Sequence, residues 1–395
     1  MTHVRDRTIH DRIARSRTSI LLLGPRQVRK STLCRALPYE LYIDLADQTE
    51  FLSFAKDPGR LRREVLARNR CGLVVIDEIQ RVPALLNTVQ SLIDQFHPQL
   101  RFVLTGSSAR KLKRGGANLL PGRIIVEWLD PLSVAETGGQ VDLDRGLRLG
   151  MLPGIYWGDD EAPAVLGTYS DVYLQEEIRA EALAKDLGGY ARFLDVMGVA
   201  SGQWINLAKL SSDSEIPKET LRRFVQLLED TLLAIRLPPF RPSRSTSRRL
   251  LQRQRVLLFD VGVRNALLGL HRHRLSADQL GAVFEQWTIL QVIYLSRAGA
   301  TGWKLSSYRS EAGAEVDLVI DRGEDVVGLE IKSGRNVGAV DTRGLLSLES
   351  LLTPKQKLRK WIAYRGERRQ RFDNGVEVWP VLEVLGQLAA DAGVT

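Results

Sequence analysis

Short apolar runs alternate with amphipathic segments along the first 110 residues of the chain. The apolar runs are rich in β-branched and aromatic residues, as in strands buried on both faces, and they cover residues 18–24, 39–45, 71–78 and 100–108. The segments between them carry apolar residues at helix spacing, and they cover residues 31–37, 60–68 and 83–96. This alternation predicts an α/β domain, with helices on the faces of a parallel sheet, that ends near residue 150.

The pattern becomes helical throughout between residues 165 and 236. Within this region, residues 205–210 predict a helix, residues 211–214 a polar turn, and Pro217 the start of a second helix. The apolar stripe of the second helix consists of Leu221, Phe224, Leu227 and Leu228. Two interpretations stay open: a pair of core helices with a polar surface, or a helix-turn-helix unit that reads DNA.

A connector with few large apolar residues follows at 238–255 and leads into a second α/β region. There, residues 256–263 predict a strand, residues 281–297 a helix, and "AEVDLVID" and "VVGLEIKS" a pair of strands. We therefore expect an α/β domain, a helical domain, a basic connector and a second α/β domain, with the bounds 1–150, 151–240, 241–255 and 256–395.

Composition narrows the class of protein. A chain of 395 residues is too long for one ordinary core, and 44% hydrophobic with 26% charged residues excludes a disordered or fibrous protein. No apolar run is long enough to cross a membrane, and the charged beginning "MTHVRDRTIHDRIARSR" lacks a secretory signal. Two cysteines, Cys34 and Cys71, are too few for a disulfide framework. We expect a cytoplasmic protein.

Charge favours an anionic partner. The net charge is +9 and the pI is about 9.6, and nucleic acid is the usual partner of such a protein. Residues 241–255 carry six arginines and no acid, and a second basic cluster covers residues 366–372. Each cluster either contacts phosphates or is a solvated segment. Contact with phosphates is expected in place of base stacking, because aromatic residues are not interleaved with the arginines.

The stretch "LLLGPRQVRKSTL" (21–33) nearly matches the phosphate-binding pattern G-x-x-x-x-G-K-[ST]. Gly24, Lys30 and Ser31 fit, whereas Arg29 occupies the position of the second glycine. An apolar strand precedes the loop and a helix follows it, so that several backbone N–H groups point at the phosphates. Lys30 is then expected to reach the β- and γ-phosphates, and the hydroxyl of Ser31 to bind Mg²⁺.

Two further strand ends complete this site. The strand "LVVIDEIQ" ends at Asp77, expected to hold Mg²⁺, and Glu78, expected to polarise the attacking water. The strand "FVLTGSS" ends with hydroxyl groups that are expected to sense the γ-phosphate. The residues predicted to bind the nucleotide are Gly24, Pro25, Arg26, Gln27, Val28, Arg29, Lys30, Ser31, Thr32, Thr105 and Ser107.

These motifs resemble those of the prokaryotic AAA-type ATP-binding proteins. The similar stretches are "GPRQVRKSTL", "VVIDEIQRVP", "RFVLTGSSARKLKRGGANLLPGR", "LPGIYW", "YLQEEIRAEAL", "LEDTLLAIRLPPF" and "AEVDLVI". The resemblance implies a P-loop ATPase domain, a winged-helix-like middle and a C-terminal domain related to PD-(D/E)XK nucleases. It also implies assembly into an oligomer in which an arginine of a neighbouring copy completes the site, with Arg123 as first candidate and Arg110 as second. The alternative for each of the two is an ordinary surface arginine.

Arg29 departs from the pattern of this family. Glycine at that position permits a positive φ and a close approach to the phosphates, and an arginine costs about 1–3 kcal/mol of backbone strain. For a micromolar site this means roughly five- to 150-fold weaker binding. A natural degenerate site, an engineered or accidental variant and a tolerated substitution stay open, and we expect impaired hydrolysis.

The C-terminal region carries Asp317 and, thirteen residues later, Glu330 and Lys332 in an E-x-K arrangement. In nucleases of this pattern the two carboxylates bind Mg²⁺ and the lysine activates water, and Glu285 would add a further carboxylate. An active nuclease, a retained fold without catalysis, and chance are the three interpretations.

The sequence as a whole predicts an AAA-type ATPase that couples Mg²⁺-dependent ATP hydrolysis to action on DNA, as a homo-oligomer without a membrane segment. The alternatives are a nucleotide-gated switch that binds a protein partner and a nucleotide-regulated, metal-dependent nuclease.

Overall fold

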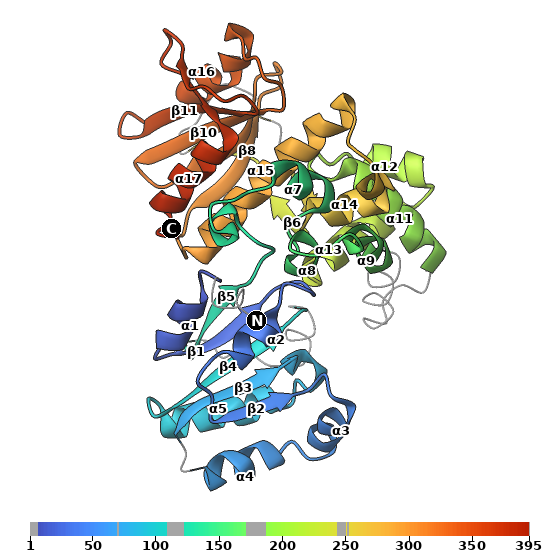
Figure 1. Cartoon of the computed structure of the whole chain (residues 1–395), viewed down its shortest axis with the longest axis vertical. Helices are drawn as coiled ribbons and strands as arrows, with labels where there is room; N and C mark the ends of the chain where they lie inside the picture. The colour runs from blue at the N-terminus through green and yellow to red at the C-terminus, as the bar shows by residue number, and fades with distance from the viewer. Residues whose placement is uncertain are drawn as a thin grey trace. The chain divides into compact units, whose positions relative to one another are not determined.

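The structure is a computed structural model that describes residues 7–68, 71–108, 122–170, 187–242, 250 and 253–394. The chain divides into two compact units (Figure 1). The first consists of residues 1–130 with 230–233, and the second of residues 131–229 with 234–395. The predicted bounds at residues 150, 240 and 255 stay predictions.

The first unit is built on a parallel sheet whose strands lie in the order β2-β3-β4-β1-β5. The strands are β1 (Ser19–Leu23), β2 (Leu41–Asp44), β3 (Gly72–Asp77), β4 (Leu100–Gly106) and β5 (Ile124–Trp128). The helices are α1 (His10–Arg15), α2 (Lys30–Arg35), α3 (Gln48–Lys56), α4 (Arg60–Ala67), η2 (Ile79–Arg81, a 3₁₀ helix) and α5 (Leu85–Phe96). All four predicted strands are confirmed, and so are the helices at α2, α4 and α5.

Four elements of this unit were not predicted from the sequence: α1, α3, η2 and β5. The strand β5 begins with three apolar residues, Ile124–Val126, but they are half-buried or exposed, and its one buried residue is Glu127. The helix α5 has a clear stripe because one face packs into the core beside β4. That stripe consists of Leu85, Leu86, Val89, Leu92 and Ile93.

The second unit begins with helices and a two-stranded antiparallel hairpin, β6–β7. These elements are η3 (Val134–Thr137), α7 (Leu143–Leu149), α8 (Pro153–Tyr156), α9 (Ala162–Thr168), α11 (Leu187–Ala200), α12 (Leu207–Ser214), α13 (Lys218–Asp230), β6 (Ala234–Leu237), β7 (Arg255–Leu258), α14 (Val261–Leu267) and η5 (Leu270–Arg272). The aromatic rings of Tyr190, Phe193 and Phe224 pack α11 against α13, with centroids 5.0–5.5 Å apart.

Three predictions for this region were wrong in part. Residues 211–214 belong to α12 rather than to a turn, and the helical region ends at β6. The apolar run 256–263 is split, because Asp260 caps α14 after the strand β7 has ended. The stretch "YLQEEIRAEAL" (173–183) lies outside the described residues.

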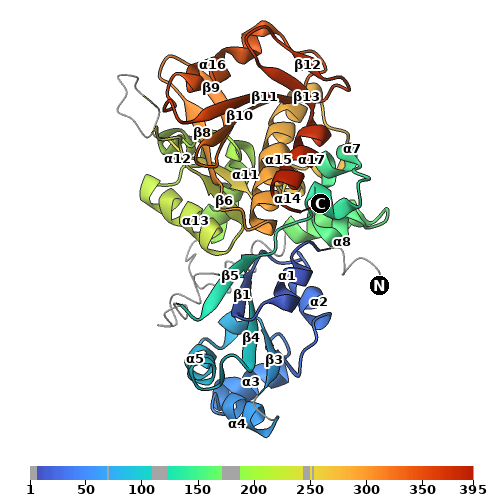
Figure 2. The same ribbon diagram turned by 90° about the vertical axis from the view of Figure 1, so that its left-hand side faces the viewer.

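The rest of the second unit is a six-stranded mixed sheet in the order β12-β13-β11-β10-β9-β8. Figures 1 and 2 show α16 on one face of this sheet and α15 and α17 on the other. The elements are α15 (Ala277–Ala298), β8 (Lys304–Arg309), β9 (Glu315–Asp321), β10 (Asp325–Lys332), η6 (Ala339–Thr342), α16 (Arg343–Glu349), β11 (Lys357–Tyr364), β12 (Gln370–Arg371), β13 (Glu377–Pro380) and α17 (Val381–Asp391). The predicted helix and the predicted strand pair β9–β10 are confirmed.

Candidate nucleotide-binding site

The predicted phosphate loop lies between β1 and α2, at the carboxyl edge of the parallel sheet. Gly24 begins the loop, and its N–H donates a 3.2 Å hydrogen bond to Gly106 O of the neighbouring strand. A Cβ at this position would lie 2.2 Å from Leu129 O, so only glycine fits between the strands. This close packing fixes where the loop leaves the sheet.

Two residues of the loop have left-handed backbone conformations. Gln27 has a φ of 65° and Arg29 a φ of 68°, a region that costs a side-chain-bearing residue roughly 1–2 kcal/mol. A left-handed residue beside a right-handed one turns successive backbone N–H groups toward a common point that suits an anion. The backbone at position 29 is therefore one that glycine would adopt without strain, as the sequence pattern indicates.

The amino group of Lys30 lies inside the loop. Its Nζ donates 2.8 Å hydrogen bonds to Gly24 O and Pro25 O, and the residue is 6% exposed. Behind it, Cys34 is buried within electrostatic reach of Lys30 and Asp77. Burial and then Asp77 raise the pKa of the Cys34 thiol, whereas Lys30 lowers it.

The other predicted loop residues differ in their access to a ligand. Val28 is fully buried in the core, so its side chain cannot contact a nucleotide and only its backbone is available. Arg26 and Ser31 are half-buried, and Gln27 and Thr32 are exposed. Ser31 occupies the first turn of α2, directly after Lys30.

Asp77 ends β3 and is 1% exposed. Its Oδ1 accepts a hydrogen bond from the hydroxyl of Thr105, at the end of β4, and its Oδ2 accepts one of 2.8 Å from the hydroxyl of Tyr42, on β2. The same Thr105 oxygen accepts a 2.9 Å hydrogen bond from the backbone N–H of Glu78. Burial, followed by the negative charge of Asp77, raises the pKa of Tyr42.

Glu78 follows Asp77 in a left-handed conformation with a φ of 59°. Its carboxylate accepts hydrogen bonds from Gln80 Nε2 and, at 3.3 Å, from Ser107 Oγ. Gln80 also donates to Ser107 Oγ at 3.0 Å. The structure thus brings together the ends of β3 and β4, as predicted, and adds Tyr42 and Gln80, which the sequence analysis missed.

Arg7 is a further residue that sequence reasoning missed. It is 6% exposed and donates hydrogen bonds to two backbone carbonyls, Val28 O at 3.0 Å and Asp130 O at 2.6 Å. Arg7 lies in a charged segment of the sequence, where nothing indicates that an arginine side chain is buried. In the fold it ties the phosphate loop to the end of the first unit.

Arg123 lies just before β5, and its Nε donates a hydrogen bond to Asp94 at the end of α5. That bond and the charge of Asp94 raise the pKa of Arg123. A role toward a neighbouring copy would require Arg123 to leave this carboxylate, and it stays a prediction. Arg110 lies outside the described residues.

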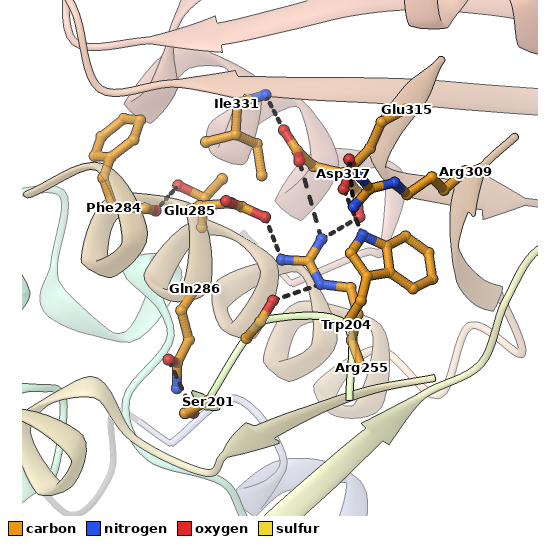
Figure 3. Close-up of polar contacts among 12 residues, drawn as sticks. Ser201, Trp204, Arg255, Phe284, Glu285, Gln286, Arg309, Glu315, Asp317 and Ile331 are labelled. Atoms are coloured by element: carbon orange, nitrogen blue, oxygen red, sulfur yellow. Dashed lines mark hydrogen bonds and ion pairs between the residues drawn. The ribbon is translucent and has the colours of Figure 1, made fainter. Parts of the chain in front are cut away.

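The C-terminal carboxylates come together in the second unit around a buried arginine (Figure 3). Asp317 Oδ2 accepts a 2.8 Å hydrogen bond from Ile331 N, and Glu330 Oε1 lies 2.8 Å from Lys332 Nζ. Burial raises the pKa of Glu330 to about 7, although Lys332 lowers it. Burial, then Glu285 and Glu330, raises the pKa of Asp317, and Arg255 opposes this shift.

Arg255, the last residue of the predicted basic connector, is not a surface residue. It begins β7, is 2% exposed, and pairs with Glu285 on α15. The prediction that residues 241–255 bind phosphate is therefore wrong for Arg255, because its guanidinium pairs with the carboxylates of Glu285 and Asp317 inside the fold. Arg241 and Arg253 are exposed, and residues 243–249 and 251–252 lie outside the described residues.

Three regions of the chain match models of known protein families. Residues 16–138 match the family model of the AAA domain. Residues 140–274 and 280–384 match two models described as domains of unknown function, DUF8612 and DUF4143. The chain therefore carries an AAA-type, P-loop ATPase-like domain. The nuclease-like relationship of the C-terminal region stays a prediction.

Relatives and a solved structure add little on function. Uncharacterized proteins of Mycobacterium tuberculosis and Mycobacterium bovis are each 27% identical over 374 residues, which is 93% of this chain and 80% of theirs. A DNA polymerase III, gamma subunit-related protein of Thermotoga maritima is 12% identical, with 57% of this chain and 99% of that chain covered. Its TM-score of 0.27 is too low to carry an argument.

The residues that the structure describes lack two features. They contain no helix with the length and apolar character needed to cross a membrane. Nor do they contain a group of three histidine, cysteine, aspartate or glutamate side chains arranged to hold a metal ion.

Proposed function

We propose that this chain is a Mg²⁺-dependent ATPase whose nucleotide state controls its action on nucleic acid, with hydrolysis impaired by Arg29. One observation carries the proposal. The loop that contains Lys30 and the polar side chains at the ends of β3 and β4 converge at one edge of a parallel sheet.

The residues at this edge divide the chemical work among them. Backbone N–H groups within residues 26–32 and the amino group of Lys30 bind the phosphates, and Asp77 and the Ser31 hydroxyl hold the metal ion. Bound Mg²⁺ would neutralise charge that develops on the β- and γ-phosphates. Glu78 orients the attacking water. Thr105 accepts a hydrogen bond from the backbone N–H of Glu78, and Gln80 and Ser107 donate hydrogen bonds to the Glu78 carboxylate.

The donor set suits Mg²⁺. Carboxylate and hydroxyl oxygens are the ligands that this ion prefers, and it commonly binds through one or two protein carboxylates together with the phosphates of its substrate. The carboxylate of Asp77 is held by hydrogen bonds from Tyr42 and Thr105, which fix its orientation.

Nucleic acid is proposed to bind beside the helix pair α12–α13. The buried stripe of α13 leaves Lys218, Arg222 and Arg223 on its exposed side. A hairpin, β6–β7, follows the helix pair, as in a winged-helix-like unit. Together with the net charge of +9, these exposed cations suit a phosphate backbone. Self-association, with Arg123 supplied to a neighbouring copy, and a cytoplasmic location complete the proposal.

ATP binding and turnover by the full chain test the nucleotide site. Lys30→Ala and Asp77→Asn are each expected to lower ATP turnover at least tenfold. If the parent chain hydrolyses ATP too slowly to measure a decrease, each substitution is made in an Arg29→Gly background and compared with Arg29→Gly alone. Arg63→Ala, an exposed arginine on α4, is the matched control. Turnover by Lys30→Ala equal to that of the parent would refute the proposed site.

Addition of DNA separates the proposed function from the alternative of a nucleotide-gated switch. Turnover is measured with and without single-stranded, duplex and branched DNA, while particle mass is followed by light scattering. We expect at least one DNA form to stimulate turnover. Unchanged turnover with all three forms would instead support a switch that binds a protein partner.

A further inference from the structure

Arg255 is surrounded by acceptors in the second unit. Its Nε donates to Gly202 O at 2.6 Å, its Nη1 to Asp317 O at 3.3 Å, and its Nη2 to the carboxylate of Glu285. The Nη1 atom also lies 3.9 Å from Asp317 Oδ1. Figure 3 shows the guanidinium between Glu285 of α15 and Asp317 of β9. The arginine thus joins the hairpin strand β7 to the two carboxylates.

A divalent cation at this place would need the oxygen atoms that Arg255 already binds. A buried guanidinium is stable only when its charge is paired and its N–H groups are bonded, so the two cations exclude each other. The lysine is also engaged: Lys332 Nζ lies 2.8 Å from Glu330 Oε1 and 3.5 Å from Asp341 Oδ1. With Arg255 in place, these residues do not fit a metal ion.

One acceptor is left over in the cluster. Glu330 Oε2 is buried and has no hydrogen-bond partner among the described residues. With Arg255 in place, Glu285, Asp317 and Glu330 are not arranged to hold a metal ion. Without the arginine, rotation of these side chains would be needed to bring their carboxylate oxygens, the ligands that hard divalent cations prefer, around one ion.

We propose that the guanidinium of Arg255 occupies the Glu285–Asp317–Glu330 carboxylate cluster and prevents the cluster from binding divalent metal ions. The C-terminal domain in this conformation is consequently not a metal-dependent nuclease. Only departure of Arg255, which requires a shift of β7 or of its side chain, opens the cluster.

Terbium luminescence tests this proposal without reference to any activity. Tb³⁺ binds carboxylates and is excited through a nearby indole, and the ring of Trp204 lies 5.9 Å from Arg255 Cζ. We expect no Asp317-dependent Tb³⁺ signal from the parent chain, and in Arg255→Met a signal at least tenfold stronger that Mn²⁺ displaces. Asp317→Asn or Trp204→Phe in the Arg255→Met background should abolish it.

Arg236→Met is the matched control, because Arg236 pairs with Glu229 at the surface of the same hairpin. It should gain no signal. A Tb³⁺ signal from the parent chain that Asp317→Asn removes would overturn the proposal, and so would a folded Arg255→Met variant that binds no Tb³⁺. If Arg255→Met does not fold, the comparison of the parent with Asp317→Asn still decides, because it needs no change at Arg255.

Discussion

The hydroxyl group of Tyr42, on β2, donates a 2.8 Å hydrogen bond to Asp77 Oδ2, on β3. Asp77 is almost completely buried, so each of its oxygens depends on a protein donor. The tyrosine therefore holds the carboxylate that we expect to bind Mg²⁺, although it belongs to no nucleotide-binding motif.

Tyr42→Phe should weaken β3 and the nucleotide site together. A hydrogen bond to a charged group contributes about 1.5–3 kcal/mol, and we expect the opening free energy of β3 to fall by about that amount. Hydrogen–deuterium exchange of the full chain measures this change, and ATP turnover should decrease with it. Tyr39→Phe, at a neighbouring exposed tyrosine, is the control. Equal exchange in the two variants would show that the bond to Asp77 does not stabilise the site.

Arg29→Gly should strengthen ATP binding. The residue has a φ of 68°. If the empty loop relaxes from this conformation, binding must restore it at a cost of about 1–3 kcal/mol, and glycine removes that cost, which corresponds to a roughly five- to 150-fold gain in affinity. Fluorescence titration with an ATP analogue measures it.

Arg29→Ala separates the backbone from the side chain, because alanine keeps the Cβ that causes the strain and removes the rest of the side chain, including the guanidinium. It should remain close to the parent chain. An alanine variant that binds as tightly as the glycine variant would assign the impairment to the arginine side chain instead.

The exposed side of α13 should contact the phosphate backbone. Arg222→Ala combined with Arg223→Ala is expected to weaken binding about equally for different DNA sequences and to reduce the salt dependence by about two phosphate contacts. Fluorescence anisotropy at several salt concentrations measures both effects. Arg369→Ala combined with Arg371→Ala, in the basic cluster 366–372, is the comparison. Weakening in that variant alone would move the contact to the C-terminal sheet.

The positions of site residues that directly follow an apolar strand could be predicted from the sequence. Asp77 and Glu78 follow an apolar run, and parallel strands bring such ends to one edge of the sheet, where the structure has them. The serines of residues 211–214 were misread as a turn, because the sequence cannot show that Ser214 Oγ bonds Leu210 O within α12.

Partners far apart in the chain could not be predicted. Arg255 lies at the end of an arginine-rich segment, and the carboxylates that bury it come 30 and 62 residues later. Tyr42 meets Asp77 only through the pairing of β2 with β3. Burial of a charge depends on such distant contacts, which neither composition nor periodicity reveals.

Asp260 should make the second unit less stable as the pH rises. Its carboxylate is 1% exposed and accepts hydrogen bonds from the backbone N–H groups of Gly262, Val263 and Met151. Burial raises its pKa from 3.8 to about 6, against the effect of these three donors. Between about pH 4 and pH 6 the folded chain therefore binds a proton that the unfolded chain has released. The free energy of unfolding consequently falls as the pH rises through this window and stays lower above it.

The size of this effect follows from the shift. A difference of about two pKa units at 1.36 kcal/mol each corresponds to about 3 kcal/mol between pH 4 and pH 7. Asp260→Asn has no proton to lose, so its stability relative to the parent should rise by about that amount across the window, whatever the cost of the altered bond to Met151. Urea unfolding of the full chain at each pH measures the difference, with Asp213→Asn on the exposed side of α12 as control. A constant difference between Asp260→Asn and the parent would mean that Asp260 stays ionised in the folded chain, held so by its three backbone donors.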